Sequence, residues 1–449
     1  MTLTKRPGLL RRIINPKIFF VMIFGVLAPA IIVLLYINRG PQNTSTYSGP
    51  RKVSIEKKNG RYGFYKDGKP FLVKGAAGSD HIKELWESGA NTIMVWDTAK
   101  LESVFREAEK YQLAVIVGLD IPPVDTGFYD NQKNVTDLYN ACISIVSRYK
   151  DNPCLLAWCL GNEVALPFSL TPGFFYRTYN RILNRIHTID PNHPVTTTMI
   201  NVLKKDVLTL RWRIPALDFY SINTYNSLKI LEQILKKDKL FWDGPYLIAE
   251  WGPRGGWEAP LTAWKAPIEY SSTTKGQLFY EFYTKYMPFK DPRFMGSVVF
   301  YWGHRQEYTQ SWFSIFDKNG NPNEIKEALN DCWKDTVTSH LSPKIKSLLI
   351  DNMDDGNNII ITSGSKHSAA LLMQSSEPLD SLKYKWELYR EDWNYPKGPP
   401  AEAGLFADST LAVTDFKAPK NEGPYRVFVS VYNSKGYFAT ANIPIYVVR

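Results

Sequence analysis

Two short motifs each place a glutamate directly after an apolar run. Glu163 lies in GNEV and follows Leu155–Leu160, and Glu250 lies in LIAEWG and follows Pro245–Ala249. Such runs have the length and composition of buried strands. Two carboxyl groups that face one pocket can cleave a glycosidic bond, one as the nucleophile and one as the acid and base. For that reaction the acid has to start protonated while the nucleophile is ionised.

The spacing of the two glutamates indicates a fold that would bring them together. They are separated by about three strand–helix repeats of roughly 29 residues, and the alternation of strands and helices predicts a parallel sheet. Eight repeats over roughly 230 residues match a (β/α)8 TIM barrel of the α/β class, with the glutamates on strands four and seven at the catalytic rim. The expected strands are 71–75, 91–96, 113–119, 154–160, 194–199, 217–222, 245–250 and 296–302, and the clearest helices are 80–88, 100–111, 174–188, 274–287 and 324–334.

The residues on either side of these repeats follow a different pattern. A short hairpin is expected from Val53, with an Asp-Gly turn in Tyr65–Pro70. After the last helix no helical period remains, and Tyr425–Val448 alternates in the manner of paired strands. This favours a small all-β sandwich of immunoglobulin type. The predicted domains are therefore a barrel at 53–342 and a β-sandwich accessory domain at 343–449.

The N-terminal segment predicts a transmembrane signal anchor. Residues 18–37 carry no charge and are long enough to span a bilayer. Basic residues gather in the tail at 1–17, which should therefore stay cytoplasmic. A cleaved signal peptide is the competing interpretation, but no A-x-A site follows the apolar stretch. The polar residues 38–52 predict a tether, so the barrel is expected outside the cytoplasm, in a periplasm, in a lumen or at the cell surface.

The net charge of +10 does not indicate a nucleic-acid partner. Basic residues gather before Glu56, the first acidic residue, and the remainder of the chain is close to neutral. Nucleic-acid binding therefore loses its main support. The four cysteines are expected to be buried free thiols, and the six histidines show no ligand spacing. Neither a metal nor an organic cofactor is predicted.

Several segments of the barrel resemble the catalytic domain of glycoside hydrolase family 2, and more broadly the clan of retaining β-glycosidases with this barrel. PCLLAWCLGNEV is similar to the acid/base segment of that family, and PYLIAEWG is similar to its nucleophile strand. LDFYSINTYN corresponds to its strand-six segment, and VVFYWG with FSIFDKNGNPNEIKEAL to its closing strand, turn and helix. The resemblance extends over most of the barrel segment.

This resemblance implies a role for five residues. Glu163 would be the acid/base and Glu250 the nucleophile. Asn162 would bond the 2-hydroxyl of the sugar, a contact that strengthens as the oxocarbenium-like transition state forms. Tyr225 would hold the nucleophile in place through its hydroxyl, and Trp302 would form the floor under the sugar.

One position departs from the family pattern. The clan commonly has an arginine in strand two near the nucleophile, where this chain has Met94. A missing cation alters the electrostatics of the nucleophile. Arg305 and His304 lie just past strand eight and are the candidates to supply the positive charge.

Other residues at strand ends are candidates for substrate binding. Trp251 and Trp257 begin the long loop after the nucleophile strand, and aromatic rings can serve as flat apolar platforms for sugars. Asp97 follows strand two and, with His304, could bind hydroxyl groups. The alternative for each is structural: a self-packed loop for the tryptophans and a helix cap for the aspartate.

The leading hypothesis is a membrane-anchored retaining glycoside hydrolase that cleaves β-linked oligo- or polysaccharides. A transglycosylase that remodels an envelope β-glucan-type polysaccharide is the alternative within enzymes, because a sugar hydroxyl can replace water in the second step. The alternative from another class is a non-catalytic glycan-binding or envelope-assembly scaffold with assembly partners, since a barrel can persist without its chemistry.

Overall fold

The computed structural model describes residues 52–449, except 168–172, 238–241, 375–380 and 392–400. The predicted cytoplasmic tail and the membrane span at 18–37 lie outside the described residues, as does all of the predicted tether except Lys52. Within the described part of the chain, no helix combines the length and apolarity needed to cross a membrane.

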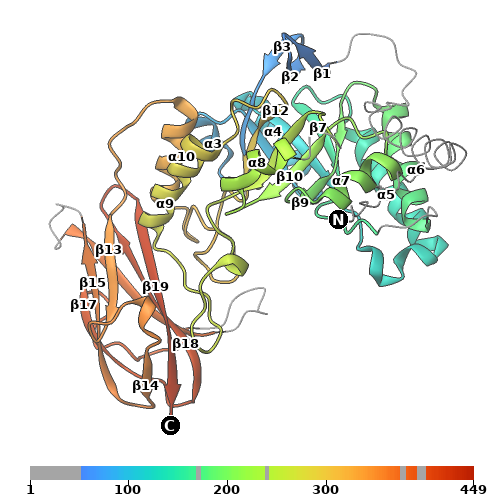
Figure 1. Cartoon of the computed structure of the whole chain (residues 1–449). Coiled ribbons are helices and arrows are strands. Elements are labelled where there is room, and N and C mark those ends of the chain that lie inside the picture. The colour runs from blue at the N-terminus through green and yellow to red at the C-terminus, as the bar shows by residue number, and fades with distance from the viewer. Residues whose placement is uncertain (1–51, 168–172, 238–241, 375–380, 392–400) are drawn as a thin grey trace, which may run out of the picture.

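The described structure is centred on a closed parallel barrel (Figure 1). The two end strands of the sheet, β8 and β9, are consecutive parts of one strand broken at Thr197, and each pairs with the neighbour on its own side. Eight strand positions therefore close into a ring, which confirms the predicted TIM barrel. The strands are β4 (Val73–Ala77), β5 (Thr92–Val95), β6 (Ala114–Leu119), β7 (Leu155–Leu160), β8 (Val195–Thr196), β9 (Thr198–Ile200), β10 (Tyr220–Thr224), β11 (Tyr246–Trp251) and β12 (Phe294–Val299).

The barrel strands are buried on both faces because helices cover the outside and side chains fill the inside. On β5, Met94 belongs to the interior cluster, whereas Ile93 and Val95 belong to the cluster under the helices. Successive side chains of a strand point to opposite faces, so a continuous apolar run is required. All four cysteines are buried and free, as predicted.

The outer layer contains eight described α-helices. The predicted helix at 324–334 matches α10, whereas the one at 274–287 is divided into α9 and a π-helical turn at Phe282–Tyr286. Two predicted strands also shift, because β10 starts later than 217 and β12 ends before 302. The helices are α3 (Ile82–Glu87), α4 (Leu101–Tyr111), α5 (Gln132–Tyr149), α6 (Phe174–Ile189), α7 (Lys204–Arg213), α8 (Leu228–Lys237), α9 (Ser272–Glu281) and α10 (Glu324–Lys334).

A small antiparallel sheet covers the amino-terminal ends of the barrel strands. It consists of β1 (Val53–Lys58), β2 (Arg61–Lys66) and β3 (Lys69–Phe71). Asp67 and Gly68 make the predicted turn, with φ of +50° and +75°. Phe64 is fully buried and meets Phe219 edge-on, with ring centroids 5.2 Å apart. The hairpin thus closes the end of the barrel opposite to the strand ends that carry the glutamates.

The C-terminal part consists of two β-sheets around one apolar core. Figure 1 shows these sheets to one side of the barrel, next to α9 and α10. The contacts include a bond of 3.0 Å from the Ile345 N–H to the Thr273 hydroxyl and one of 2.9 Å from the Thr440 N–H to the Ser272 hydroxyl. One sheet contains β13 (Ile345–Ile350), β15 (Lys366–Met373) and β17 (Val413–Lys417), and the other contains β14 (Ile360–Thr362), β19 (Phe438–Val448), β18 (Gly423–Tyr432) and β16 (Lys383–Arg390).

His340 ties α10 to the segment that leads into the sandwich. Its Nδ1 lies 2.6 Å from Glu324 Oε1, and its Nε2 lies 2.8 Å from Asp331 Oδ2. Glu327 accepts two backbone N–H groups at 2.6 and 3.0 Å. Glu324, Glu327 and His340 are close enough together to hold a metal ion. Both ring nitrogens and both Glu327 oxygens already have hydrogen-bond partners, so a protonated histidine between carboxylates accounts for the cluster.

This histidine clasp predicts a pH-dependent stability. Hydrogen bonding to Glu324, and then to Asp331, raises the pKa of His340 from 6.5 to about 9. The clasp therefore stabilises the native state fully below pH 6.5 and loses its contribution as pH rises through about 9. His340→Gln should lower the free energy of unfolding by on the order of 1 kcal/mol at acidic pH, after allowing for solvent screening. Thermal unfolding across this range measures the difference, and a gap independent of pH would contradict the clasp.

Candidate active site

Glu163 is held in the turn that follows β7. Its φ is +50° and that of Gly161 is +86°, both in the left-handed region that favours glycine. A non-glycine residue there is strained, and such strain tends to occur at functional positions. The Glu163 N–H donates to the hydroxyl of Thr198 on β9 at 2.8 Å. The turn thus presents an exposed carboxyl group at the carboxyl end of the barrel.

Asn223 on β10 connects this turn to a neighbouring strand end. Its amide donates to Glu163 Oε1 at 2.9 Å and to Asn162 Oδ1 at 3.1 Å. The Thr198 hydroxyl donates to the same Asn162 oxygen at 2.7 Å. The ends of β7, β9 and β10 are therefore joined by hydrogen bonds that fix where the Glu163 carboxyl group lies.

Glu250 is aimed inward by an irregularity in β11. The pairing of β10 with β11 skips Ala249 and resumes with Asn223 opposite Glu250. An extra residue of this kind changes the direction in which the following side chain points. Glu250 is consequently buried, with 5% of its surface exposed. The Tyr225 hydroxyl donates to Glu250 Oε2 at 3.4 Å.

The surroundings of Glu250 favour its protonated form. Burial, followed by the negative charge of Glu163, raises the pKa of Glu250 to about 8. Arg305 and the Tyr225 hydroxyl act in the opposite direction, and Glu307 adds to the rise. The influence of Glu163 requires the two carboxyl groups to share one neighbourhood. The retaining reaction requires Glu250 to be ionised when it attacks the sugar.

Arg305 is a cation that acts on Glu250 from the loop after β12. Met94 is fully buried in the barrel interior, so β5 supplies no cation there. Arg305 lies close enough to Glu250 to lower its pKa. The guanidinium pairs with Glu307 at 2.5 Å and lies 5.0 Å from the centre of the Phe300 ring. That a cation past strand eight substitutes for the missing arginine stays a prediction.

Trp257 has the exposed ring that a sugar platform requires. Its side chain is 56% exposed, and its ring meets Tyr225 edge-on with centroids 5.0 Å apart. Phe300 and Phe313 also contact Tyr225, at 5.8 and 6.0 Å between centroids. An aromatic cluster therefore surrounds the tyrosine that touches Glu250, with Trp257 at its exposed edge.

The other two predicted tryptophans are fully buried. Trp251 is fully buried and packs against Phe279 of α9, because it follows the inward-pointing Glu250 and so points to the helix layer. Trp302 is also fully buried, lies beyond the end of β12, and donates to the His81 carbonyl at 3.0 Å. The predicted contact of Trp302 with sugar is therefore corrected to a packing role, whereas Trp251 also lines the aromatic cavity beside the site and its contact with sugar stays a prediction.

Asp97 and His304 have structural partners. The Asp97 carboxylate accepts the N–H of Ala99 at 3.1 Å and caps a short 3-10 turn, which is the structural alternative for this residue. His304 Nδ1 lies 3.3 Å from the Ser314 hydroxyl. It lines a cavity between the loop after β12 and the sandwich, which includes Lys385. A hydroxyl-binding role for either residue stays a prediction.

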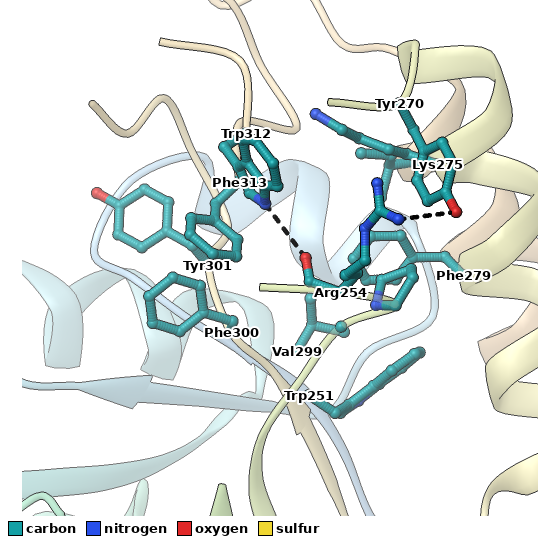
Figure 2. Close-up of a pocket in the computed structure, with 13 residues that line it drawn as sticks. Trp251, Arg254, Tyr270, Lys275, Phe279, Val299, Phe300, Tyr301, Trp312 and Phe313 are labelled. Carbon is teal, nitrogen blue, oxygen red and sulfur yellow. Dashed lines mark hydrogen bonds between the residues drawn. The ribbon is translucent and has the colours of Figure 1, made fainter. Parts of the chain in front are cut away.

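A mainly aromatic cavity is lined by Trp251, the residue that follows Glu250, and by side chains of the segments after β11 and β12. Figure 2 shows the rings of Phe300, Tyr301 and Phe313 gathered on one side of it. Arg254 lies on the other side and donates to the Tyr270 hydroxyl at 3.1 Å. The cavity lies between the segment after β11, the strand that carries Glu250, and the segment after β12, which contains Arg305.

Two residues of the site were missed in the sequence. Thr198 carried no recognisable signal, because a threonine in a strand is usually a β-former. Asn223 did carry one, because it lies near the end of β10 and two positions before Tyr225, the residue predicted to hold the nucleophile. The position of Tyr225, which was predicted to contact the nucleophile, could therefore have drawn attention to Asn223 as a second polar residue of the site.

Removing the Asn223 amide should impair the placement of Glu163 more than the stability of the fold. Asn223→Ala is expected to lower kcat by up to about a hundredfold, because misplacing a catalytic group by a fraction of its contact distance is costly. Steady-state kinetics and thermal unfolding would be measured side by side. A variant with unchanged kcat would show that the hydrogen bond to Glu163 has no catalytic importance.

Comparisons with known proteins identify glycosidases. No family model matches the sequence. A segment of 73 residues is 41% identical to mannan endo-1,4-beta-mannosidase F of Aspergillus clavatus and covers 16% of each chain. A segment of the same length is 37% identical to a probable enzyme of that name from Neosartorya fischeri. The matched segment thus spans only 16% of the length of these curated relatives.

Solved structures of glycosidases are similar over larger parts. A beta-glucuronidase from Bacteroides uniformis has a TM-score of 0.49 at 14% identity, covering 88% of this chain and 48% of its own. An endo-beta-1,4-mannanase from Thermotoga petrophila has a TM-score of 0.41 at 12% identity, covering 85% and 99%. A GH2 beta-galacturonidase from Eisenbergiella tayi has a TM-score of 0.49 at 16% identity, covering 64% and 54%. The similar proteins named here are glycoside hydrolases, among them a member of the family that the motifs resemble.

Proposed function

We propose that the chain is a membrane-anchored retaining glycoside hydrolase that acts on β-linked glycans outside the cytoplasm. The observation that carries this proposal is the convergence of Glu163 and Glu250. Asn223 contacts the first carboxyl group, and Tyr225, two residues further along the chain and just past the end of β10, contacts the second. The glycosidase relatives support the reaction class, and the predicted signal anchor at 18–37 supports the location.

In the first step the Glu250 carboxylate attacks the anomeric carbon, and Glu163 donates its proton to the oxygen of the leaving group. The glycosidic bond breaks as the bond to the enzyme forms, so each carboxyl group changes its charge once. Arg305 and the Tyr225 hydroxyl favour the ionised nucleophile that this step consumes. The bond from the Asn223 amide to the Asn162 side-chain oxygen supports a role for the Asn162 amide nitrogen as donor to the 2-hydroxyl.

In the second step Glu163 has lost its proton and acts as the base. It takes a proton from water, and the water oxygen attacks the anomeric carbon and releases Glu250. Esterification of Glu250 removes its negative charge. Glu163 can then carry a negative charge as the base without repulsion from Glu250. The exposed ring of Trp257 would support the apolar face of a sugar next to this centre.

The experiment that tests the proposal is a substrate panel with purified full-length protein. We expect release of sugar from at least one β-aryl glycoside or β-linked oligosaccharide, and loss of that release in Glu250→Gln. Proton NMR of the first product should show the β-anomer, because two displacements retain the configuration. A first-formed α-anomer would contradict the retaining mechanism.

The same panel distinguishes the alternative functions. Oligosaccharide products longer than the input would reassign the protein as a transglycosylase, since a sugar hydroxyl would then have intercepted the glycosyl-enzyme. Glycan binding without turnover across mannans, glucans and galactans would favour the scaffold function. Extraction of cell membranes with carbonate would test the anchor, because a protein with an uncleaved span stays in the pellet.

A further inference from the structure

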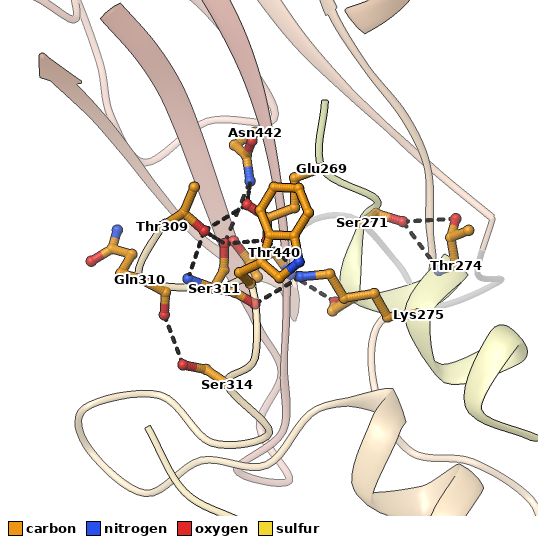
Figure 3. A network of polar contacts seen from close by, with 12 residues as sticks. Glu269, Ser271, Thr274, Lys275, Thr309, Gln310, Ser311, Ser314, Thr440 and Asn442 are labelled. Atoms are coloured by element: carbon orange, nitrogen blue, oxygen red, sulfur yellow. Dashed lines mark hydrogen bonds and ion pairs between the residues drawn. The ribbon is translucent and has the colours of Figure 1, made fainter. Parts of the chain in front are cut away.

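A buried polar network joins the sandwich to the loop that follows β12 (Figure 3). We propose that the sandwich is a positioning element of the active site: Asn442 fixes Glu269, and Glu269 fixes the loop that places Arg305 beside Glu250. The proposal rests on the proposed catalytic role of Glu250. It gives the C-terminal sheets a function in the reaction and makes Asn442 a positioning residue far from the chemistry in sequence.

Glu269 is the centre of this network. It lies in the segment between β11 and α9 and is 2% exposed. Its carboxylate pairs with Lys275 Nζ at 2.5 Å and accepts the Thr309 and Ser311 hydroxyls at 2.6 and 2.8 Å. Asn442 on β19 donates to it at 2.8 Å. A buried carboxylate is stable only when such partners compensate for lost hydration, so removing one partner is costly.

The amide of Asn442 is fixed from the sandwich side. Arg426 on β18 donates to Asn442 Oδ1 at 2.6 Å, which leaves the amide nitrogen directed at Glu269. Arg426 is 1% exposed and also pairs with Glu391 at 2.7 Å. A further bond of 2.7 Å runs from Arg426 to the carbonyl of Pro267 in the barrel segment. Two neighbouring strands of one sheet, β18 and β19, therefore hold the donor in place and also contact the barrel.

The loop after β12 is fixed to Glu269 by Thr309 and Ser311, and hydrogen bonds within the loop connect this attachment to Arg305 and Glu307. The Thr309 backbone exchanges two hydrogen bonds with the Glu307 backbone, at 2.7 and 3.1 Å. The Ser314 hydroxyl accepts a hydrogen bond from the Arg305 backbone N–H at 2.9 Å and donates one to the Gln310 carbonyl at 2.8 Å. A displacement of Thr309 would therefore be transmitted directly to Glu307 and Arg305.

The charged and titratable groups that act on Glu250 are Glu163, Arg305, Glu307 and Tyr225. Arg305 is the cation among them, and its effect exceeds the opposing one of Glu307. If the loop loses its attachment, Arg305 is no longer held in place, and Glu250 should release its proton at a higher pH. A purely architectural sandwich would leave this titration unchanged.

The test is a titration of the Glu250 carboxyl group in the full-length protein. Carbon-13 NMR of glutamate-labelled protein follows it, with Glu250→Gln identifying the signal. Asn442→Asp removes the donor and adds a charge beside Glu269. We expect the Glu250 midpoint to rise by about half a pH unit or more, with the acid limb of kcat/KM moving in the same direction. Thr309→Val removes a donor from the loop side and should produce a shift of the same sign.

Asn421→Asp is the matched control, because it makes the same change at an exposed position of the sandwich. It should leave the midpoint unchanged. An unshifted midpoint in folded Asn442→Asp and Thr309→Val, or a lower kcat without a change in the pH profile, would overturn the proposal. If Asn442→Asp fails to fold, Thr309→Val decides alone. The titration needs no turnover, so a shifted midpoint in a protein inactive on every glycoside would refute the proposed function and leave the coupling intact.

Discussion

Glu250→Gln should reduce turnover of a β-aryl glycoside by about four to six orders of magnitude, because the variant cannot form the glycosyl-enzyme. Intact-mass spectrometry with a slow fluorinated substrate would show the mass of one sugar added to wild type and none to the variant. A variant that retained more than a few per cent of activity would assign the nucleophile to another group.

The stability of Glu250→Gln provides an internal control for this loss. The folded pKa of Glu250 is about 8, against 4.5 for the model carboxyl group, so ionisation weakens the native state as pH rises between these values. A neutral glutamine escapes this penalty. The variant should therefore unfold at a higher temperature than wild type, and the gain should grow over that pH range. Inactivity together with greater stability cannot be attributed to misfolding.

Glu163→Gln should produce a loss that depends on the leaving group. General acid catalysis contributes about a hundredfold to ten-thousandfold, and a poor leaving group needs the proton most. Natural glycans should therefore lose nearly all turnover, whereas an activated dinitrophenyl glycoside should still form the glycosyl-enzyme. The second step then stalls, because no base activates water. Burst kinetics would reveal the accumulating intermediate.

Azide distinguishes the role of Glu163 from a general structural effect. A small anionic nucleophile needs no base, so it should restore turnover of the activated substrate and yield a β-glycosyl azide. Glu163→Gln should respond to azide while Glu250→Gln does not. Equal responses of the two variants, or an α-configured product, would reverse or remove the assigned roles.

The sequence was sufficient for the elements that periodicity controls. Buried strands of a parallel barrel are continuous apolar runs, so their places were predictable to within a few residues. The hairpin at Asp67 and Gly68 followed from local turn chemistry. Both glutamates were found for the same reason. Each follows an apolar strand, and the carboxyl ends of all strands in such a barrel lie at the same rim.

Periodicity failed where the strands are irregular. The extra residue at Ala249 turns Glu250 inward and leaves Trp251 in the helix layer, so two adjacent residues that both looked like site residues were separated. No local propensity encodes that bulge; the pairing with β10 determines it. Trp302 was misassigned for a related reason, because β12 ends before it and its ring is packed beside α10.

By itself the amino-acid sequence determined the barrel, the presence of a second all-β part and the two carboxylates, because apolar period and motif are local properties. The tertiary structure alone decided that Asn223 joins Glu163 to Asn162 and that the sandwich reaches Glu269 through Asn442. These contacts join residues from 60 to 173 positions apart. Hydrogen bonding and charge act through space, so only folding brings such partners within range.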